Sequence, residues 1–340
     1  MSVLSLGSGP DDIAQAAQHL AQGGLVGLPT ETVYGLAANA DDAQAVGAIF
    51  SSKGRPNNHP LIVHVAGQTA AQWLQAVQHY AHNIPAPALA LMQAFWPGPL
   101  TIIVPRKPDI GQAAAGGQDS IGLRCPSHPV AQAVLKAALD QGVWGLAAPS
   151  ANRFGRVSPT LASHVLSEFA DWNGEHPLLV LDGGACKVGI ESTIVDASRG
   201  FLALLRPGMI SPEALEKAAG QPVVAPDAHA PRASGTLASH YAPQARVQLM
   251  DGPTLAQNYA QLSPLERTRV ALFHRETLPT PITGPHVIMA DQAQDAAHQL
   301  FATLRWLDQA HVKTIWVQTP PQTSEWQGVL DRLQRAAAER

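Results

Sequence analysis

The sequence has few of the residues that mark several common protein classes. It contains two cysteines in 340 residues, Cys125 and Cys186, and neither stands in a CxxC pair or near histidines at zinc-ligand spacing. A disulfide framework and a zinc site are therefore not indicated, and no metal-binding side chains are predicted. No stretch approaches the roughly 18 to 20 consecutive apolar residues of a membrane span, and the first residues lack the pattern of a signal peptide. We expect a cytoplasmic protein without a membrane partner.

Charged residues are also scarce, at 14% of the chain, whereas hydrophobic residues make up 46%. This balance argues against disorder, and a chain of this length is expected to form two domains. The net charge is −4, and 11 of the 22 Lys and Arg residues lie within residues 1–210. Proteins whose main task is to bind a nucleic-acid backbone usually carry a basic stripe. An RNA-binding module is therefore the alternative hypothesis, and the even charge does not favour it.

Short apolar runs alternate with segments of helical period, which is typical of an α/β fold. In the first two thirds of the chain, strands are predicted at residues 24–29, 61–65, 100–104, 120–124, 145–148, 178–182 and 192–196. Helices are predicted at residues 11–22, 43–51, 130–139 and 161–169. Ser158, Pro159 and Thr160 are a start signal for the last of these helices, with a hydroxyl available to cap the first amides.

A stretch rich in Pro and Ala at residues 222–231 is typical of an extended connector and predicts a domain boundary. We predict a first domain over residues 1–210, a linker over residues 211–244 and a smaller open α/β domain over residues 245–340. Strands are predicted there at residues 246–250, 270–273, 286–289 and 314–318, with helices at 292–310 and 326–338. This part has no glycine-rich phosphate loop, so the chemistry is expected in the first domain.

Hydroxyls and basic groups gather where predicted strands end. Thr30 and Thr32 follow the first strand, and ligands of open α/β sheets bind at such edges. Lys53 and Arg55 share a short loop and suit the oxygens of a polyphosphate. An exposed basic pair is more often only solvated, however, and hydroxyls after a strand are often only turn residues.

Later strands end in similar groups. Arg124 closes a predicted strand, where its guanidinium suits an amino-acid carboxylate, with a salt bridge to a nearby acid as the alternative. His59 and His64 flank another strand and either contact ligand or are structural. The start of the helix predicted after Thr160 suits an anion. The remaining candidates at strand ends are Ser150, Asn152, Ser158, Ser192, Thr193 and Arg206.

Together these motifs resemble the YrdC/Sua5 family. The resemblance is carried by residues 29–36, 53–56, 60–64, Ser150-Ala151-Asn152, Ser158-Pro159-Thr160, Ser192-Thr193 and Arg206-Pro207-Gly208. Ser239-His240-Tyr241-Ala242-Pro243 resembles the linker motif of the long form, so the resemblance covers essentially the whole chain. It implies an N-terminal YrdC-like twisted-sheet domain with a concave ligand cavity, followed by a smaller Rossmann-like Sua5 domain.

The resemblance also implies an activity, that of an L-threonylcarbamoyladenylate synthase. Such a nucleotidyltransferase makes threonylcarbamoyl-AMP and pyrophosphate from L-threonine, bicarbonate or CO2, and ATP with Mg²⁺. Its product is passed to the machinery that adds the t6A modification to tRNA. Relatives in hydrogenase maturation embed a similar domain, but they carry zinc-finger and acylphosphatase-like modules for which this chain has neither the cysteines nor the length.

Carried over by position, the resemblance assigns ligand contacts. ATP contacts are expected from Lys53, Arg55, His59, Ser120, Ser150, Asn152, Ser158, Arg206, His240 and Tyr241, the last two on a linker segment that folds over the nucleotide. L-threonine contacts are expected from Thr30, Thr32, His64, Arg124, Ser192 and Thr193. Catalysis is expected from charge stabilisation by Lys53, Arg55 and Arg206. His59 departs from the family, which often has Asn at this position.

Overall fold

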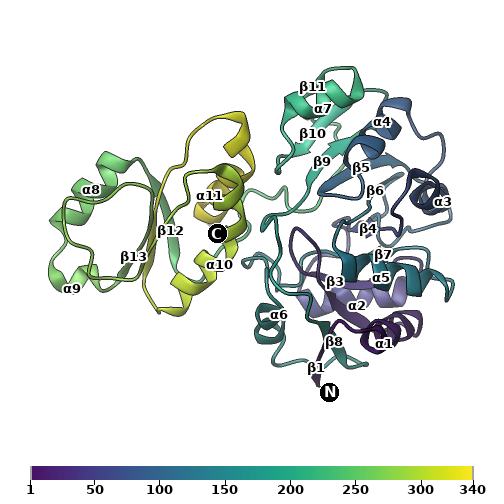
Figure 1. Ribbon diagram of the computed structural model, residues 1–340, viewed down its shortest axis with the longest axis horizontal. Coiled ribbons are helices and arrows are strands. Elements are labelled where there is room, and N and C mark those ends of the chain that lie inside the picture. The colour runs from purple at the N-terminus through teal and green to yellow at the C-terminus, as the bar shows by residue number, and fades with distance from the viewer. Residues whose placement is uncertain (1, 339–340) are drawn as a thin grey trace.

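The computed structural model describes residues 2–338. The predicted start of the first domain, residue 1, and the predicted end of the second, residues 339 and 340, lie outside the described residues. Two α/β units lie beside each other, with the N-terminal unit on the right and the C-terminal unit on the left of Figure 1. The predicted α/β fold is confirmed. In the described part of the chain, no helix is both long enough and apolar enough to pass through a lipid bilayer.

The N-terminal unit is built on a mixed sheet. Its described strands are β1 (Val3–Leu6), β2 (Leu25–Leu28), β3 (Gly35–Asn39), β4 (Ile62–His64), β5 (Leu100–Pro105), β6 (Ser120–Arg124), β7 (Leu146–Ala147), β8 (Leu178–Leu181), β9 (Thr193–Asp196), β10 (Leu202–Arg206) and β11 (Val223–Val224). They lie in the order β1-β8-β2-β3-β7-β4-β6-β5-β9-β10-β11. Segments far apart in the sequence, such as β4 and β6 or β5 and β9, are therefore neighbours and bring their ends together.

Helices cover this sheet. They are α1 (Pro10–Ala21), α2 (Ala43–Lys53), α3 (Ala70–Tyr80), α4 (Ala86–Phe95), α5 (Pro129–Leu139), α6 (Ala162–Glu168) and α7 (Pro212–Ala219). The Asp42 side chain caps α2 by accepting from the amides of Gln44 and Ala45. The helix ends at Gly54, whose φ of 63° is the left-handed conformation that glycine adopts without a Cβ penalty. This turn separates the side chains of Lys53 and Arg55.

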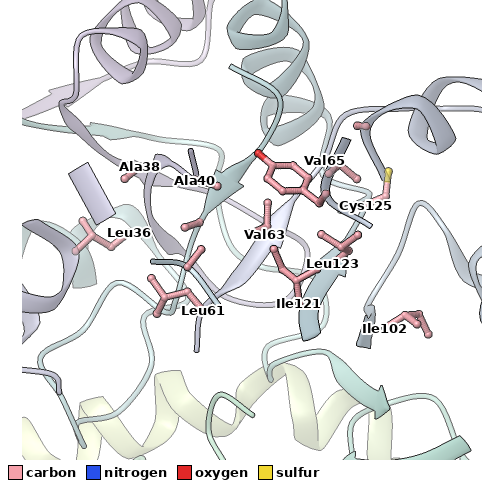
Figure 2. Close-up of a cluster of buried hydrophobic side chains, with 14 of the residues drawn as sticks. Leu36, Ala38, Ala40, Leu61, Val63, Val65, Ile102, Ile121, Leu123 and Cys125 are labelled. Atoms are coloured by element: carbon pink, nitrogen blue, oxygen red, sulfur yellow. The ribbon is translucent and has the colours of Figure 1, made fainter. Parts of the chain in front are cut away.

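The core of the N-terminal unit lies between the sheet and these helices. Figure 2 shows part of it, with Leu36 of β3, Val63 of β4, Ile121 and Leu123 of β6, and Ile102 of β5, all at most 1% exposed. Burying a side chain of this size stabilises the fold by about 1.5 to 3 kcal/mol. The strand ends that carry the candidate ligand groups are thus anchored by tightly packed strands.

The C-terminal unit has a smaller parallel sheet in the order β12-β15-β13-β14. Its elements are β12 (Arg246–Met250), α8 (Gly252–Gln261), α9 (Pro264–Arg267), β13 (Val270–His274), β14 (His286–Ile288), α10 (Ala293–Gln309), β15 (Thr314–Gln318), a short 3₁₀ helix at Ser324–Trp326 and α11 (Gln327–Ala337). Helices α10 and α11 lie on the side that faces the N-terminal unit (Figure 1). They are the elements that meet the site.

Two sequence expectations differ from the structure. Helix α6 begins at Ala162 after Leu161, without a side-chain cap, so the prediction that Ser158 to Thr160 starts and caps it is wrong. The Ser158 hydroxyl instead donates to Glu191, a contact between residues far apart in the sequence. In addition, the segment 211–244 contains α7 and β11, and β11 pairs with β10 in the larger sheet. The stretch without helix or strand runs over residues 225–245.

Candidate functional site

A cavity lies where the strand ends meet the linker segment. Of the predicted site residues it is lined by Thr30, Thr32, Arg55, His64, Arg124, Ser150, Ser192, Arg206, His240 and Tyr241. These residues come from the ends of several strands, the loop after α2 and the linker. The polar groups that recur at strand ends in the sequence thus come together around one cavity.

Arg55 and Arg206 lie on the basic side of the cavity. Arg206 donates from Nε and Nη2 to the Ser192 carbonyl at 3.1 and 2.8 Å, and from Nη1 to the Ser234 carbonyl at 2.8 Å. Arg55 donates to the Pro60 carbonyl at 3.0 Å and to Ser234 Oγ at 3.3 Å. Burial lowers the pKa of Arg55 to about 10, so the group is still a cation at neutral pH.

Lys53 has a different place from Arg55. Its ammonium donates to the backbone carbonyls of Ser150, at 2.6 Å, and Asn152. Burial, followed by the nearby charge of Arg55, holds the pKa of Lys53 well below its usual range. The lysine therefore fastens the Ser150-Ala151-Asn152 loop beneath the cavity and is not among the residues that line it.

Arg124 is paired with an acid inside the protein. Its Nη2 donates to Glu31 Oε1 at 2.7 Å, and Glu31 Oε2 accepts from the Ser127 amide at 3.1 Å. Both side chains are buried, at 4% and 7% exposed. The salt-bridge alternative for Arg124 is thus present, and the guanidinium still lines the cavity. Glu31 fixes the direction of the arginine and was not expected from the sequence.

The end of the cavity beside Arg124 is polar but uncharged. Thr30 Oγ1 donates to the Val33 carbonyl at 2.6 Å and lies 2.9 Å from Thr32 Oγ1. His64 also lines the cavity, and its Nδ1 is 3.2 Å from the Ile62 carbonyl. Burial, helped by the charge of Arg124, lowers the pKa of His64 to about 3, so the ring is neutral at pH 7.

The linker closes one wall of the cavity with His240 and Tyr241. The His240 ring contacts Phe154 edge-on at 6.0 Å between centroids, and the Tyr241 ring lies 5.4 Å from that of Phe301 on α10. Tyr241 has a φ of 62°, an uncommon conformation for a residue with a side chain. Both residues are buried, so packing against the two domains holds the segment in place.

Three buried polar atoms at the site have no hydrogen-bond partner among the described residues. They are Arg55 Nε, Asn152 Oδ1 and His240 Nδ1. Buried polar atoms are nearly always paired, because leaving one unpaired costs about 1 to 3 kcal/mol. A polar ligand with both donors and acceptors would satisfy such a set. Arg55 and His240 both line the cavity, and their unpaired atoms are the clearest sign in the geometry that the cavity is built to hold a ligand.

The other predicted residues lie around the cavity. Those outside its lining are Lys53, His59, Ser120, Asn152, Ser158 and Thr193, and Ser120 lines a neighbouring cavity with Arg232 and Ser234. His59 is half-buried, with its ring 5.7 Å from that of Phe154. Thr193 Oγ1 accepts from the Ile210 amide. The ligand contacts predicted for these six residues would therefore require a ligand that extends beyond the cavity.

Glu191 lines the cavity and was missed as a site residue. Burial alone would raise its pKa, but Arg332, Arg206 and the Ser158 hydroxyl together bring the pKa below its ordinary value, so the group is an anion. The only sequence signal for it is its place directly before Ser192. In a site expected to bind anions, a carboxylate is not an obvious candidate.

Known proteins match the chain over nearly its whole length. Residues 18–208 match the Sua5/YciO/YrdC family, whose description is telomere recombination, and residues 210–338 match the C-terminal domain of threonylcarbamoyl-AMP synthase. The threonylcarbamoyl-AMP synthase of Pyrococcus abyssi is 33% identical, over 96% of this chain and 94% of its own. That of Bacillus subtilis is 34% identical, over 98% and 95%.

A solved structure agrees with the sequence comparison. The crystal structure of P. abyssi Sua5 complexed with L-threonine has a TM-score of 0.86 with this chain, at 30% identity, and the match covers 99% of this chain and 98% of that one. Both units and the cavity between the strand ends and the linker lie within the matched part. The chain therefore belongs to the Sua5/YciO/YrdC family, in the long form that carries the C-terminal Sua5 domain.

Proposed function

We propose that this chain is a threonylcarbamoyl-AMP synthase, which joins L-threonine, bicarbonate or CO2, and ATP into threonylcarbamoyl-AMP and pyrophosphate for the t6A modification of tRNA. The observation that carries the proposal is a cavity lined by Arg55, Arg124 and Arg206, in which two lining residues, Arg55 and His240, have a buried polar atom without a partner among the described residues. Full-length similarity to proteins of this name, and to one solved with L-threonine, supports it.

The polarity of the cavity suggests where each substrate binds. L-threonine would bind at the end with Thr30, Thr32, His64 and Arg124, where the arginine, already aimed by Glu31, meets the carboxylate. A hydrogen bond to the threonine hydroxyl would reject analogues that lack it. ATP would bind along the side with Arg55, Ser150 and Arg206, beneath the linker. To reach both arginines, its phosphates must replace the contacts that Ser234 now makes.

The reaction needs positioning and charge stabilisation more than a strong base. The neutral amine of threonine adds to CO2 and loses one proton to solvent, which gives a carbamate, and a carbamate oxygen then attacks the α-phosphorus of ATP. The bond from that phosphorus to the bridging oxygen breaks, and pyrophosphate leaves with the electron pair. Arg55 and Arg206 would stabilise the charge on the phosphates, a contribution typically worth several kcal/mol in a buried site. Lys53 would act by holding the Ser150 loop.

Mg²⁺ would enter as part of the ATP complex. Within residues 2–338, no group of three or more His, Cys, Asp or Glu side chains is placed to hold a metal ion. Glu191, the carboxylate that lines the cavity, is already bonded to Ser158 and Arg332. In this proposal the phosphate oxygens would bind the ion, which would neutralise charge on the leaving pyrophosphate. We place the protein in the cytoplasm, where ATP and the tRNA-modification machinery are found.

The decisive experiment is pyrophosphate release from Mg²⁺-ATP with L-threonine and bicarbonate, each omitted in turn. L-Serine and L-valine test whether both the hydroxyl and the methyl group of threonine are read. Release that depends on threonine and bicarbonate together supports the synthase. Release that ignores threonine, or no release, would return the RNA-binding alternative to consideration. That alternative predicts tRNA binding that weakens steeply with salt, whereas small-ligand binding in a cavity should weaken far less.

A single substitution tests the charge argument. Arg55→Ala removes the unpaired Nε and one cavity cation, and we expect kcat/KM for ATP to fall by about 10²- to 10³-fold, as when one transition-state donor is lost. Far-UV circular dichroism and the melting temperature should be close to those of the wild type. Lys136→Ala, at an exposed position on α5, is the matched control and should keep full activity. Full activity of the Arg55 variant would contradict the assignment.

A further inference from the structure

Arg332 of the C-terminal unit reaches the wall of the nucleotide cavity. It lies on α11, and its side chain is 0% exposed, although arginine is almost never fully buried without a partner. Its Nε donates to Glu191 Oε2 at 2.9 Å, and its Nη2 donates to the Glu191 carbonyl at 3.2 Å. Glu191 lines the cavity together with Arg206. One charged group of the C-terminal unit is thus paired with one charged group of the proposed active site.

The same guanidinium touches two more parts of the cavity wall. Its Nη1 donates at 2.7 Å to the carbonyl of Pro207, the residue after Arg206. Its Cζ lies 5.5 Å from the centre of the Tyr241 ring, within cation–π distance. A Cβ on Gly328 would lie 2.7 Å from the Gly208 carbonyl, so α11 sits directly on this strand end. Arg332 therefore joins three segments that surround the nucleotide side.

Arg332 is also paired with Asp331, which in turn is paired with Arg335. The Arg332 Nη1 donates to Asp331 at 2.8 Å, and Asp331 accepts from Arg335 Nε at 3.0 Å. Arg335 donates to the Leu237 carbonyl, and its own carbonyl accepts from the His240 amide at 3.2 Å. Helix α11 thus holds the linker on one side and Glu191 on the other.

We infer that Arg332 is a positioning residue for nucleotide binding, which acts by neutralising Glu191 and holding the linker against the cavity. This inference rests on the proposed nucleotide site. An unpaired Glu191 carboxylate would repel the phosphates of ATP, and a buried charge that loses its partner is strongly unfavourable. The C-terminal unit is then part of the active site through a residue that does not touch substrate.

A double-mutant cycle on the full chain tests the charge argument. Arg332→Met removes the ion pair of Glu191 with Arg332 and leaves it the Ser158 hydrogen bond. We expect the Kd for ATP to rise at least about tenfold, with a smaller change in the KM for threonine. Adding Glu191→Gln removes the uncompensated charge and should recover most of the lost affinity for ATP, while the part of the loss that comes from the linker contacts of Arg332 remains. If Arg332→Met binds ATP as the wild type does, or if the double variant binds as weakly as Arg332→Met, the inference is wrong.

Arg305 provides the matched control. It also crosses from the C-terminal unit, where Nη2 lies 3.0 Å from Glu168 Oε2 and Nε donates to the Ser158 carbonyl, but Glu168 does not line the cavity. Arg305→Met loosens the same interface without unpairing Glu191. Adding Glu168→Gln to it should therefore give no recovery of ATP binding. Equal recovery in both cycles would mean that any repair of the interface suffices, and would overturn the specific role of Arg332.

Two further measurements keep the outcome clear. If Arg332→Met does not fold, Glu191→Gln alone is informative, because removing an anion from the cavity should leave ATP binding as tight or tighter. Weaker binding in that variant would contradict the inference. ATP binding is measured by calorimetry without threonine, so it does not depend on turnover. If the wild type binds ATP but releases no pyrophosphate, the proposed reaction is refuted. The double-mutant cycle on Arg332 and Glu191 would still measure the effect of the pair on ATP binding.

Discussion

Buried histidines set the charge of the site at the scale of single residues. His64 is 2% exposed and His240 is 6% exposed, and burial lowers the pKa of each to about 3. Neither ring is therefore a cation at the pH where the enzyme would work. In the proposed function, the positive charge that would face the phosphates comes from arginine, whose protonation does not vary near neutral pH.

His64 gives the stability of the fold a predictable pH dependence. Its pKa is about 3 in the folded state and about 6.5 in the unfolded chain, so the unfolded state binds more protons between these values. The stability due to the neutral ring is complete above about pH 6.5 and is lost as the pH falls toward 3. We expect the free energy of unfolding of the wild type to decrease from pH 7 to pH 5, by up to about 1.4 kcal/mol per pH unit from this group.

The test is the same denaturation series on His64→Gln, which cannot take up the proton. The decrease between pH 7 and pH 5 should be smaller in this variant than in the wild type. His229→Gln, at an exposed position, should keep the slope of the wild type. A slope for His64→Gln equal to that of the wild type would refute the argument.

The turn at Gly54 is the element that aims the basic loop. Gly54 and Gly220 both end a helix in the left-handed conformation, with φ of 63° and 68°, and a Cβ at either would have no atom within 4 Å. Replacement by Ala should therefore cost each about 1 kcal/mol of stability through backbone strain alone. Only Gly54→Ala should also raise the KM for ATP, because only that turn directs Arg55. Equal kinetics in the two variants would contradict this role.

The sequence predicted elements best where the pattern was local. The runs at β2, β4, β5 and β6 were short, apolar and rich in branched residues, and they form strands close to the predicted bounds. Strand β3 was not predicted, since Gly35–Asn39 carries small residues directly after a motif that indicated a turn. The supposed cap at Ser158 failed because its hydroxyl bonds to Glu191, 33 positions away in the sequence.

The candidate site shows the same limit. Its polar residues could be found because they follow strands, and the resemblance gave their expected ligands. The partners that orient these residues could not be found in this way, because Glu31 and Arg124 are 93 residues apart in the sequence and Glu191 and Arg332 are 141 apart. Such pairs depend on how the chain returns to the cavity, and that path is set by the packing of whole units.

The two units share one hydrophobic cluster at the scale of the whole molecule. Val33, Val157 and Ile190 of the N-terminal unit pack in the same cluster as Phe301 and Leu333 of the C-terminal unit. Because this apolar surface would be exposed if one unit unfolded alone, we expect a single unfolding transition by scanning calorimetry.

Charging that cluster should separate the units. Val157 is 4% exposed, and Val157→Asp would bury a carboxylate without a partner, so we expect two transitions in place of one. Ile288→Asp is the matched control, because Ile288 is 64% exposed on β14 and its variant should keep one transition. One transition in both variants would show that the units are coupled by other contacts.

The linker described above has two parts that differ in how tightly they are held. Residues 225–229 are exposed, whereas Ser234, Gly235, His240 and Tyr241 line the cavity and Ala242 donates to the Gly155 carbonyl at 2.9 Å. A protease should therefore cut the first part and spare the second. The two fragments would stay together through the shared cluster and the arginine pairs. The molecule could then be made as two polypeptides, split near residue 227, that assemble into one enzyme.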